Sequence, residues 1–500
     1  LTALSTLPNN EAPMPLPHTP QRPPTGTNPT TRAATGAAVR SLVLLGALLS
    51  LAASAGAGAG ALESSAHLRL AATADAAAPA AEARTTDEKE ALEAFLQGLK
   101  ARYAPDKRLA VWELEASFSQ ASETDPAWAV IKGRTDNAEV IGALQRAVRF
   151  RRIMAAIDVK LLPEDDPAVG DACWALVSVP TASFLKDAAF AASTVTQAVI
   201  GTPLRVLQKE GPFWRAQTPD GYIGWVHGLQ IKRLTVDELS DWNAAPKSVV
   251  TARTTLVTDA VGGVVSPLPA AGMVMRVAEE PEGRMRVQLP DGRTGFVKTS
   301  DIKDAELAFK DWERLRTGPS EAFFSAFADN ARMLAGTSYL WGGASSEGVD
   351  CSGFLSLLWR LTGVIIGRDA DQQFASAAPV TNTLEAAELT IEDIRSIPAG
   401  ALLAFGKPAD ENRTSPVIQH VALSLGAGTF IHALGSVRIE SLDPASPVFS
   451  DYERSRFLGA RWITPTLTDV PCTSTWADNG FYQSPPRELS PCRLPDIVRP

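Results

Sequence analysis

Histidine and cysteine are scarce in this 500-residue sequence, which holds five histidines and four cysteines. A surplus of positive charge is also lacking, because 47 Lys and Arg face 56 Asp and Glu, for a formal net charge of -9. Without that surplus, few groups are left to neutralise phosphates, so we expect no nucleic-acid partner. Hydrophobic residues make up 45% and charged residues 21%, values typical of globular chains, and the length predicts several domains.

An apolar run of full bilayer length is also missing. The most apolar stretch, residues 41–53, follows a Pro- and Thr-rich segment with three arginines, and small residues come after it, including Ala59-Gly60-Ala61. This order is typical of a secretory signal. We therefore predict a signal peptide with an upstream extension at 1–61, no stable membrane span after cleavage, and a periplasmic or extracellular protein. A membrane anchor is the alternative.

Composition predicts where linkers and domains alternate. An Ala-rich linker at 62–85 leads into a small α/β domain at 86–165, in which residues 87–102 and 137–149 have helical spacing and residues 109–115 alternate like a strand. A Pro- and Cys-containing tail occupies 466–500. Its Cys472 and Cys492 lie close together in sequence, and whether they form a disulfide is left open.

An internal repeat occupies the middle of the chain. Residues 214–226 match residues 285–297 at an offset of 71, and seven of thirteen positions are identical. Each copy holds two β runs around a Pro-Asp-Gly turn, the local chemistry of a tight hairpin. The copies resemble bacterial SH3-like domains, which predicts two small β-barrels, at 166–235 and 245–305. Plain structural hairpins are the alternative.

Cys351 is the cysteine whose neighbours predict chemistry. From Phe354 to Gly363 apolar residues follow helical spacing, and Asp350 stands where a helix N-cap would, which places Cys351 in the first turn. Unpaired backbone N–H groups and the helix dipole favour a thiolate there. Thiols so placed have pKa values of roughly 3.5–7.5 instead of about 8.5. This position favours a nucleophilic thiolate, and a structural cysteine, the more frequent case at a helix start, is the alternative.

Two of the five histidines fall on one predicted hairpin. Residues 417–425 alternate as a strand, 426–428 turn the chain, and 429–433 return. The spacing of 12 keeps His420 and His432 on one face, opposite each other or one diagonal apart. One thiol and two imidazoles can act as nucleophile, base and orienting group. A zinc site of these three side chains is the alternative. No further Cys has metal-ligand spacing, so we predict neither a metal nor a cofactor.

Several motifs, in order, resemble the NlpC-type family of papain-like cell-wall cysteine peptidases. They are Tyr339-Leu-Trp-Gly-Gly343, Asp350-Cys-Ser-Gly-Phe354, His420-Val-Ala-Leu423 and Phe430-Ile-His-Ala433. With the SH3-like copies and Tyr103-Ala-Pro-Asp-Lys-Arg108, the likeness extends to γ-D-glutamyl-L-diamino acid endopeptidases, over about residues 95–465. The resemblance implies a multidomain α+β protein in which two small SH3-like β-barrels precede a papain-like catalytic domain at 306–465.

The resemblance also implies a reaction. In that family a Cys thiolate attacks the amide between γ-linked D-Glu and a diamino acid in peptidoglycan stem peptides, such as murein tri- or tetrapeptides. Carried over, Cys351 is the nucleophile, His420 the general base and His432 the group that orients it. Tyr339 would help to hold the oxyanion, beside the backbone N–H of Cys351.

Substrate-binding residues follow from the same resemblance. Asp350 and Ser352 would bind the substrate, Asp350 by pairing with a free N-terminal amine, and Tyr222 would close the pocket over a terminal L-Ala. The sequence departs from the family at Ser193, where relatives often carry Glu, and at Ala370, where some carry Ser. Two other interpretations stay open: a wall-binding protein with an inactive peptidase domain, and an amidase or acyltransferase on the same fold.

Overall fold

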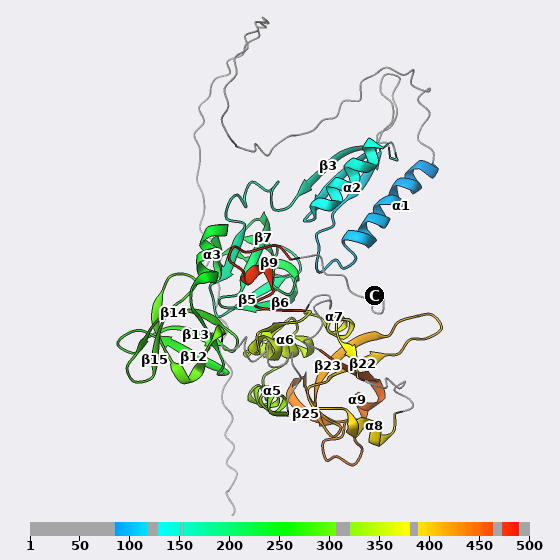
Figure 1. Cartoon of the computed structure of the whole chain (residues 1–500). Helices are drawn as coiled ribbons and strands as arrows, with labels where there is room; N and C mark the ends of the chain where they lie inside the picture. Colours follow the sequence, from blue (N-terminus) through cyan, green and yellow to red (C-terminus); the bar gives the residue numbers. More distant parts are fainter. Residues whose placement is uncertain are drawn as a thin grey trace, which may run out of the picture. The chain divides into compact units, whose positions relative to one another are not determined.

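The structure, a computed structural model, describes residues 86–118, 129–150, 152–153, 155–306, 321–380, 389–463 and 473–489 (Figure 1). The predicted signal segment, the Ala-rich linker and the question of a Cys472–Cys492 bond lie outside these residues. Within them, no helix combines the length and the apolar character that crossing a bilayer requires.

The first module pairs two helices with a three-stranded sheet. Its elements are α1 Thr86–Tyr103, β1 Glu115–Phe118, β2 Ala129–Thr135, α2 Ala138–Arg149 and β3 Ala155–Leu161. The strand order is β1-β2-β3, and α2 connects the parallel pair β2–β3. Leu92 and Leu96 of α1 and Leu144 of α2 are buried in one cluster with this sheet. The two predicted helices are confirmed. The predicted strand at 109–115 is wrong for most of its length, because only Glu115 belongs to a strand, β1, and only Trp112 makes an isolated bridge.

The second module is a seven-stranded antiparallel sheet of order β10-β4-β7-β8-β9-β5-β6. Its strands are β4 Trp174–Val177, β5 Thr181–Leu185, β6 Thr194–Val199, β7 Pro203–Glu210, β8 Phe213–Gln217, β9 Ile223–His227 and β10 Ile231–Leu234. The short helices η1 Gly228–Gln230 and α3 Val236–Ala244 complete it.

The third module repeats the second strand for strand. Its order is β13-β12-β16-β15-β14-β11-β17, the same topology with each label raised by seven. The strands are β11 Lys247–Val250, β12 Thr254–Thr258, β13 Val264–Pro269, β14 Met273–Glu280, β15 Arg284–Gln288, β16 Thr294–Lys298 and β17 Ile302–Asp304, with η2 Thr299–Asp301 before the last. The sequence repeat is therefore a structural repeat. The predicted barrels need one correction, because neither sheet closes: each ends on two unpaired edge strands.

The fourth module contains several helices and a six-stranded antiparallel sheet. The strand order of this sheet is β21-β26-β22-β23-β24-β25. The strands of the sheet are β21 Ala378–Pro379, β22 Leu402–Lys407, β23 Val417–Gly426, β24 Thr429–Leu434, β25 Ser436–Ser441 and β26 Phe457–Trp462. Three short strands of the module lie outside it: β18 Ala344–Ser345, β19 Gly348–Val349 and β20 Val364–Ile365. Its helices are α5 Glu321–Met333, α6 Cys351–Leu361, α7 Ala370–Ala375, α8 Ile391–Ser396 and α9 Asp451–Arg456. The predicted multidomain α+β class is thus confirmed.

Helix α6 is the central element of this module. All eleven of its residues are buried, as expected for a helix that is apolar on most sides. Phe354 and Leu358 belong to one core cluster with Val421 of β23 and Ile431 of β24. This packing holds the first turn of α6 against the two strands that carry the paired histidines.

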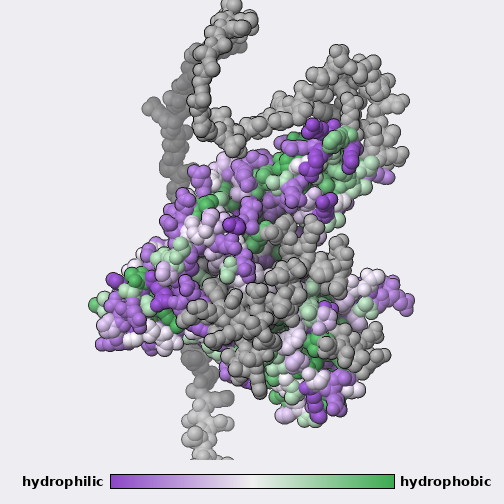
Figure 2. Space-filling view, in the orientation of Figure 1, coloured by the Kyte–Doolittle hydropathy of each residue, from purple (hydrophilic) through white to green (hydrophobic). Residues whose placement is uncertain are grey.

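Part of the C-terminal tail packs back onto the modules before it. Strand β27 Ser474–Thr475 pairs with β20, and the turn η4 Gly480–Tyr482 places Phe481 edge-on against Trp174, with ring centroids 5.0 Å apart. Asn243 donates hydrogen bonds to the carbonyls of Phe481 and Gln483. Elsewhere Figure 2 shows hydrophilic side chains over much of the visible surface, with smaller hydrophobic areas among them.

Candidate active site

Cys351 is the first residue of α6, as the sequence predicts. Asp350 is the N-cap, and its Oδ1 accepts a hydrogen bond from the Gly353 N–H at 2.7 Å. The thiol is 8% exposed. Backbone N–H groups of Ser352 and of Val421 face it, so the sulfur lies beside the residue that follows His420.

His420 and His432 meet on the predicted hairpin. Leu423 pairs with Ile431 across β23 and β24, a register that sets the two histidines one diagonal apart on the same face. His420 Nε2 lies 2.8 Å from His432 Nδ1, so one ring donates a hydrogen bond to the other. The rings of Phe405 and Phe430 pack against this pair. The other nitrogen of His420, Nδ1, is not engaged with His432.

The expected lowering of the thiol pKa is wrong. Burial raises the pKa of Cys351 to about 11, and the nearby Asp350 carboxylate adds to this rise. The N–H groups of Val421 and Ser352 oppose it but do not outweigh it. Position at a helix start was visible in the sequence, whereas the depth of burial was not. The thiol is therefore neutral at pH 7.

Burial acts on the two imidazoles in the opposite direction. It lowers the pKa of His420 to about 3, with the neighbouring His432 as the next cause. It also lowers the pKa of His432 to about 3, and the Arg438 guanidinium contributes. Both rings are therefore neutral at pH 7, and each carries a proton on one nitrogen and a lone pair on the other.

Asp350 has a partner that the sequence did not reveal. Arg368 donates to Asp350 Oδ1 at 3.0 Å and to Oδ2 at 2.7 Å. The N–H groups of Gly342 and Gly353 and the hydroxyl of Ser352 complete the set of donors. Five donor groups therefore hold this carboxylate in place, and its pairing with a substrate amine stays a prediction. Ser352 is held in the same network, since Arg368 Nη1 also donates to its hydroxyl.

Tyr339 lies near the thiol. Burial raises the pKa of the Tyr339 hydroxyl to about 12, and the charges of Cys351 and Asp350 are the next causes. Residue 339 forms a parallel bridge to Val349, one position before the N-cap of α6. The structure therefore brings Tyr339, Asp350 and Cys351 together, as predicted.

Tyr222 comes from the second module, which contains the first SH3-like copy of the sequence repeat and is called the first SH3-like module below. It follows the predicted Pro-Asp-Gly turn and is 7% exposed. Burial and the nearby Asp369 carboxylate raise the pKa of its hydroxyl, while Arg108 and Arg368 oppose that rise. Tyr222 thus lies close to the start of α7, next to the segment that holds Asp350.

Strand β6 of the same module contacts the loop before α6. Gln197 Oε1 accepts hydrogen bonds from the Ala344 N–H at 3.1 Å and from the Ser345 hydroxyl. Arg368 Nε donates to Thr196 Oγ1 at 2.8 Å. Thr196 and Gln197 follow closely after Ser193, the position in this segment at which the sequence departs from the family. In the sequence, the polar run Thr194-Val-Thr-Gln197 was the signal that could have indicated these contacts.

The N-terminal module reaches the same region through Arg108. Its guanidinium donates to Asp369 and Asp371 at the start of α7 and to Asp106, each at 2.7–2.9 Å. Its carbonyl accepts from the N–H of Ile223, the residue after Tyr222. The sequence indicated no role for Arg108, which stood out only as the last residue of the motif Tyr103-Ala-Pro-Asp-Lys-Arg108.

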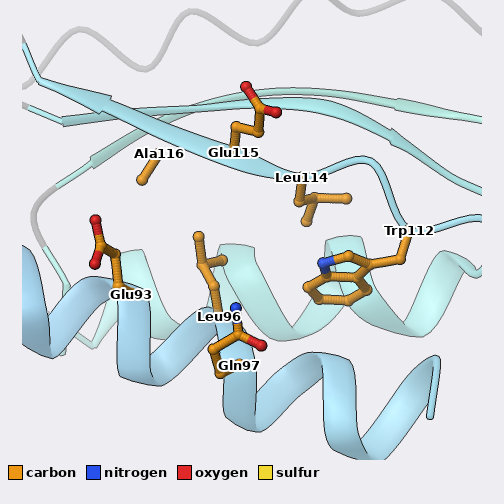
Figure 3. A pocket seen from close by; sticks show the side chains of 7 residues that line it. All are labelled: Glu93, Leu96, Gln97, Trp112, Leu114, Glu115 and Ala116. Carbon is orange, nitrogen blue, oxygen red and sulfur yellow. The ribbon is translucent and has the colours of Figure 1, made fainter.

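One cluster of described residues has ligand atoms spaced as a metal site requires. It consists of His420, His432 and Glu453, whose ligand atoms lie within 4.8 Å of one another, and it leaves out Cys351. The zinc alternative built on Cys351 therefore gains no support. A separate pocket of about 300 Å³ lies between α1 and β1 of the N-terminal module, with Trp112 at one end and Glu93 at the other (Figure 3). Its lining contains none of the predicted site residues.

Comparison with known proteins matches two segments to families. Residues 336–461 match the NlpC/P60 family, and residues 185–231 match the bacterial dipeptidyl-peptidase SH3 domain. The chain is similar to a gamma-D-glutamyl-L-lysine dipeptidyl-peptidase of Bacillus cereus, 25% identical over 280 residues that cover 54% of this chain and 75% of that protein. It is also similar to dipeptidyl-peptidase 6 of Lysinibacillus sphaericus, 33% identical over 168 residues, 33% of this chain and 50% of that protein.

A solved structure gives a third likeness. The crystal structure of an NlpC/P60 family protein from Bacillus cereus aligns with a TM-score of 0.46 and 20% identity, covering 58% of this chain and 100% of that one. The family resemblance taken from the motifs is confirmed by the two matched segments.

Proposed function

Because residues 336–461 belong to the NlpC/P60 family and residues 185–231 to the bacterial dipeptidyl-peptidase SH3 domains, we propose that this chain is a cysteine endopeptidase of peptidoglycan stem peptides. The bond it cuts is the amide between γ-linked D-Glu and a diamino acid. The observation that carries this proposal is the buried thiol of Cys351 on the first turn of α6, beside the hydrogen-bonded pair of His420 and His432. The relative in Bacillus cereus is named for a γ-D-glutamyl-L-lysine bond.

The neutral thiol and neutral imidazole define the first step. Cys351 Sγ attacks the amide carbon while its proton passes to His420 Nδ1, the nitrogen not bonded to His432. The carbonyl oxygen becomes an oxyanion, which the backbone N–H of Cys351 and the Tyr339 hydroxyl stabilise. His420 then gives its proton to the leaving amine of the diamino acid, and an acyl-enzyme remains.

Water completes the reaction by the same route in reverse. His420 takes a proton from water, the resulting hydroxide attacks the thioester carbon, and the thiol leaves with the proton returned to it. His432 keeps the ring of His420 oriented through both steps. These reaction steps use no metal or cofactor.

The first SH3-like module limits what precedes the γ-D-glutamyl unit. Tyr222 lies close to the start of α7, and β6 is bonded to the loop before α6. We therefore assign the free N-terminal L-Ala of the peptide to the space beside Tyr222. Asp350, whose carboxylate is held in place by Arg368 and Ser352, pairs with the terminal amine of that L-Ala.

Incubation with defined muropeptides tests the function. L-Ala-γ-D-Glu-diaminopimelate should release the dipeptide L-Ala-D-Glu and a diamino-acid fragment, detected by mass spectrometry. The variant Cys351→Ala should have no turnover and an unchanged thermal unfolding midpoint. Undiminished cleavage by Cys351→Ala would end the cysteine-peptidase proposal, and binding without cleavage by the wild type would favour the inactive wall-binding alternative. Release of an amine from another amide, or of an alcohol from an ester, would favour the amidase or acyltransferase.

Export is part of the same proposal. Peptidoglycan lies outside the cytoplasmic membrane, and residues 41–53 have the apolar character of a signal segment. N-terminal sequencing of the protein recovered from outside the cell should begin near Ala61. Recovery of the uncleaved chain in the membrane fraction would support the anchor instead.

A further inference from the structure

Three buried polar atoms meet behind the histidine pair without a hydrogen-bond partner among the described residues. They are Nε2 of His432, Oε2 of Glu440 and Oε1 of Glu453. His432 Nε2 and Glu440 Oε2 are 3.4 Å apart, and the Glu453 side chain is fully buried. An unsatisfied donor beside two unsatisfied acceptors is costly unless the donor serves the acceptors, so this convergence needs an explanation.

The positions of the two glutamates follow from the fold. His432 pairs with Arg438 across β24 and β25, so Glu440, two residues on, lies diagonally across the same face. Glu453 belongs to the first turn of α9, whose N-cap is Ser450. Neither residue belongs to a motif that the family resemblance used.

The charges around this cluster favour a proton over a metal ion. Arg438 pairs with the outer oxygen of Glu440 at 2.7 Å, and Arg456 lies 3.4 Å from the outer oxygen of Glu453. A cation bound by His420, His432 and Glu453 would sit beside both guanidiniums. It would also break the 2.8 Å hydrogen bond between the two imidazoles.

The direction of the hydrogen bond between the two imidazoles decides whether His420 can act as a base. If His432 carries its proton on Nε2, its Nδ1 accepts from His420 Nε2–H, and His420 Nδ1 is left with a lone pair for the thiol. If His432 carries its proton on Nδ1, it donates to His420 Nε2 instead. His420 then holds a proton on Nδ1 and cannot accept one from Cys351. The two rings must therefore change tautomer together.

We propose that Glu440 is a positioning residue that accepts the Nε2 proton of His432 and thereby fixes both histidines in the tautomers that leave His420 Nδ1 free. This inference rests on the proposed peptidase function for its kinetic consequence, but not for the tautomers themselves. Glu440 is preferred over Glu453 because its Oε2 lies 3.4 Å from His432 Nε2 and its other oxygen is paired with Arg438, which favours the ionised, accepting form.

The direct test is nitrogen-15 NMR of the full chain with labelled histidine, which suits a protein with only five histidines. Long-range proton–nitrogen spectra distinguish the two tautomers of a neutral ring. In the wild type, His420 and His432 should both carry the proton on Nε2. In Glu440→Leu, which has no acceptor, both rings should shift toward the Nδ1–H form. Their signals are assigned with His420→Gln and His432→Gln.

Kinetics give the second readout. Glu440→Leu should lower kcat by between about 10-fold and 10⁴-fold with little change in KM, the range seen when a group that fixes a catalytic histidine is lost. Glu440→Gln keeps an acceptor oxygen and should recover part of the loss. Arg438→Gln is the matched control, because it disturbs the same carboxylate from its other side and leaves the acceptor in place, so kcat should stay within about twofold.

Each result decides the proposal. An Nδ1–H tautomer of His432 in the wild type, or wild-type tautomers and kcat in Glu440→Leu, would overturn it, as would one tightly held zinc per chain lost with His432→Gln. If the protein cleaves no γ-D-glutamyl peptide, the proposed function fails while the tautomer spectra still decide the role of Glu440. Because Glu440 is partly exposed on a strand, we expect its variants to fold, and the wild-type spectrum alone can refute the proposal.

Discussion

Arg368 binds both oxygens of Asp350, and the guanidinium that does so is 1% exposed. The same group donates to Thr196 on the first SH3-like module. One buried cation thus ties the N-cap of the helix that bears Cys351 to a neighbouring module. Its loss would leave a buried carboxylate without its counter-charge beside the thiol.

Replacing Arg368 should therefore destabilise the catalytic module strongly. We expect Arg368→Met to lower the free energy of unfolding by about 3–5 kcal/mol, because a buried ion pair that loses one partner leaves an uncompensated charge. Denaturant titration followed by tryptophan fluorescence measures this. Arg395→Met is the control, since Arg395 pairs with Asp443 while half exposed, and it should cost less than about 1 kcal/mol. Equal losses for both variants would contradict the argument.

Alkylation should report the protonation state of Cys351. With its pKa raised to about 11, the thiol is almost fully protonated at pH 7, and only the thiolate reacts with iodoacetamide. The labelling rate at Cys351 should therefore rise about tenfold per pH unit between pH 7 and 10. Peptide mass spectrometry gives the rate, with Cys351→Ala as the background. A rate independent of pH from 6 to 9 would instead indicate a preformed thiolate–imidazolium pair.

The sequence located Cys351, His420 and His432 because they sit in local patterns. Asp350 capping α6, and two histidines at even spacing on a hairpin, each need only a few neighbouring residues. Arg368 and Glu440 were missed because their roles depend on partners brought close by tertiary packing. The thiol pKa was missed for the same reason, since burial outweighs the effect of the helix start. The presence of two like β-modules followed from the repeat, whereas their strand order and the open edges of their sheets did not.

Acid should destabilise the protein through the histidine pair. Both folded pKa values are lowered to about 3, below the ordinary value of 6.5. Each ring therefore contributes stability that is complete above pH 6.5 and is lost as pH falls toward 3. Glu453 acts in the opposite sense: its pKa is raised from 4.5 to about 7, so its contribution is complete below pH 4.5 and lost as pH rises through 7.

The two histidines outweigh the single glutamate, so the unfolding midpoint should fall between pH 6.5 and 4. His432→Gln removes one of the rings and should make this fall shallower, by at most about 1.4 kcal/mol per pH unit. Differential scanning calorimetry at several pH values compares the two proteins. An identical dependence on pH would show that His432 takes up its proton as readily in the folded state as in the unfolded one.

The N-terminal module should influence substrate binding through Arg108. Arg108→Gln breaks its hydrogen bonds to Asp369 and Asp371, which hold the start of α7 near Tyr222. We expect KM to rise about tenfold with a smaller change in kcat, because a misplaced binding surface leaves the thiol and imidazole in place. Arg134→Gln is the control, since its pair with Glu113 is exposed on both sides. A large fall in kcat at unchanged KM would place Arg108 in the chemistry instead.

Tyr222 should make the enzyme select peptides with a free N-terminus. It is buried near Asp369 at the start of α7, and we expect its ring to block a chain longer than one residue before D-Glu. Muramic acid linked to L-Ala would have to occupy that place. We expect kcat/KM for free L-Ala-γ-D-Glu-diaminopimelate to exceed that for the sugar-linked peptide by roughly 100-fold or more, since exclusion by a wall is a repulsive form of specificity.

The size of the side chain at position 222 tests this wall directly. Tyr222→Ala should bring the two kcat/KM values closer together, chiefly by raising the value for the sugar-linked peptide. Tyr222→Phe keeps the ring and should keep the preference, unless the hydroxyl itself binds the terminal amine, in which case the value for the free peptide falls. Comparable kcat/KM of the wild type on both substrates would refute the selection. It would also make this protein an enzyme of wall remodelling, because stems still attached to the glycan would then be its substrates as readily as released peptides.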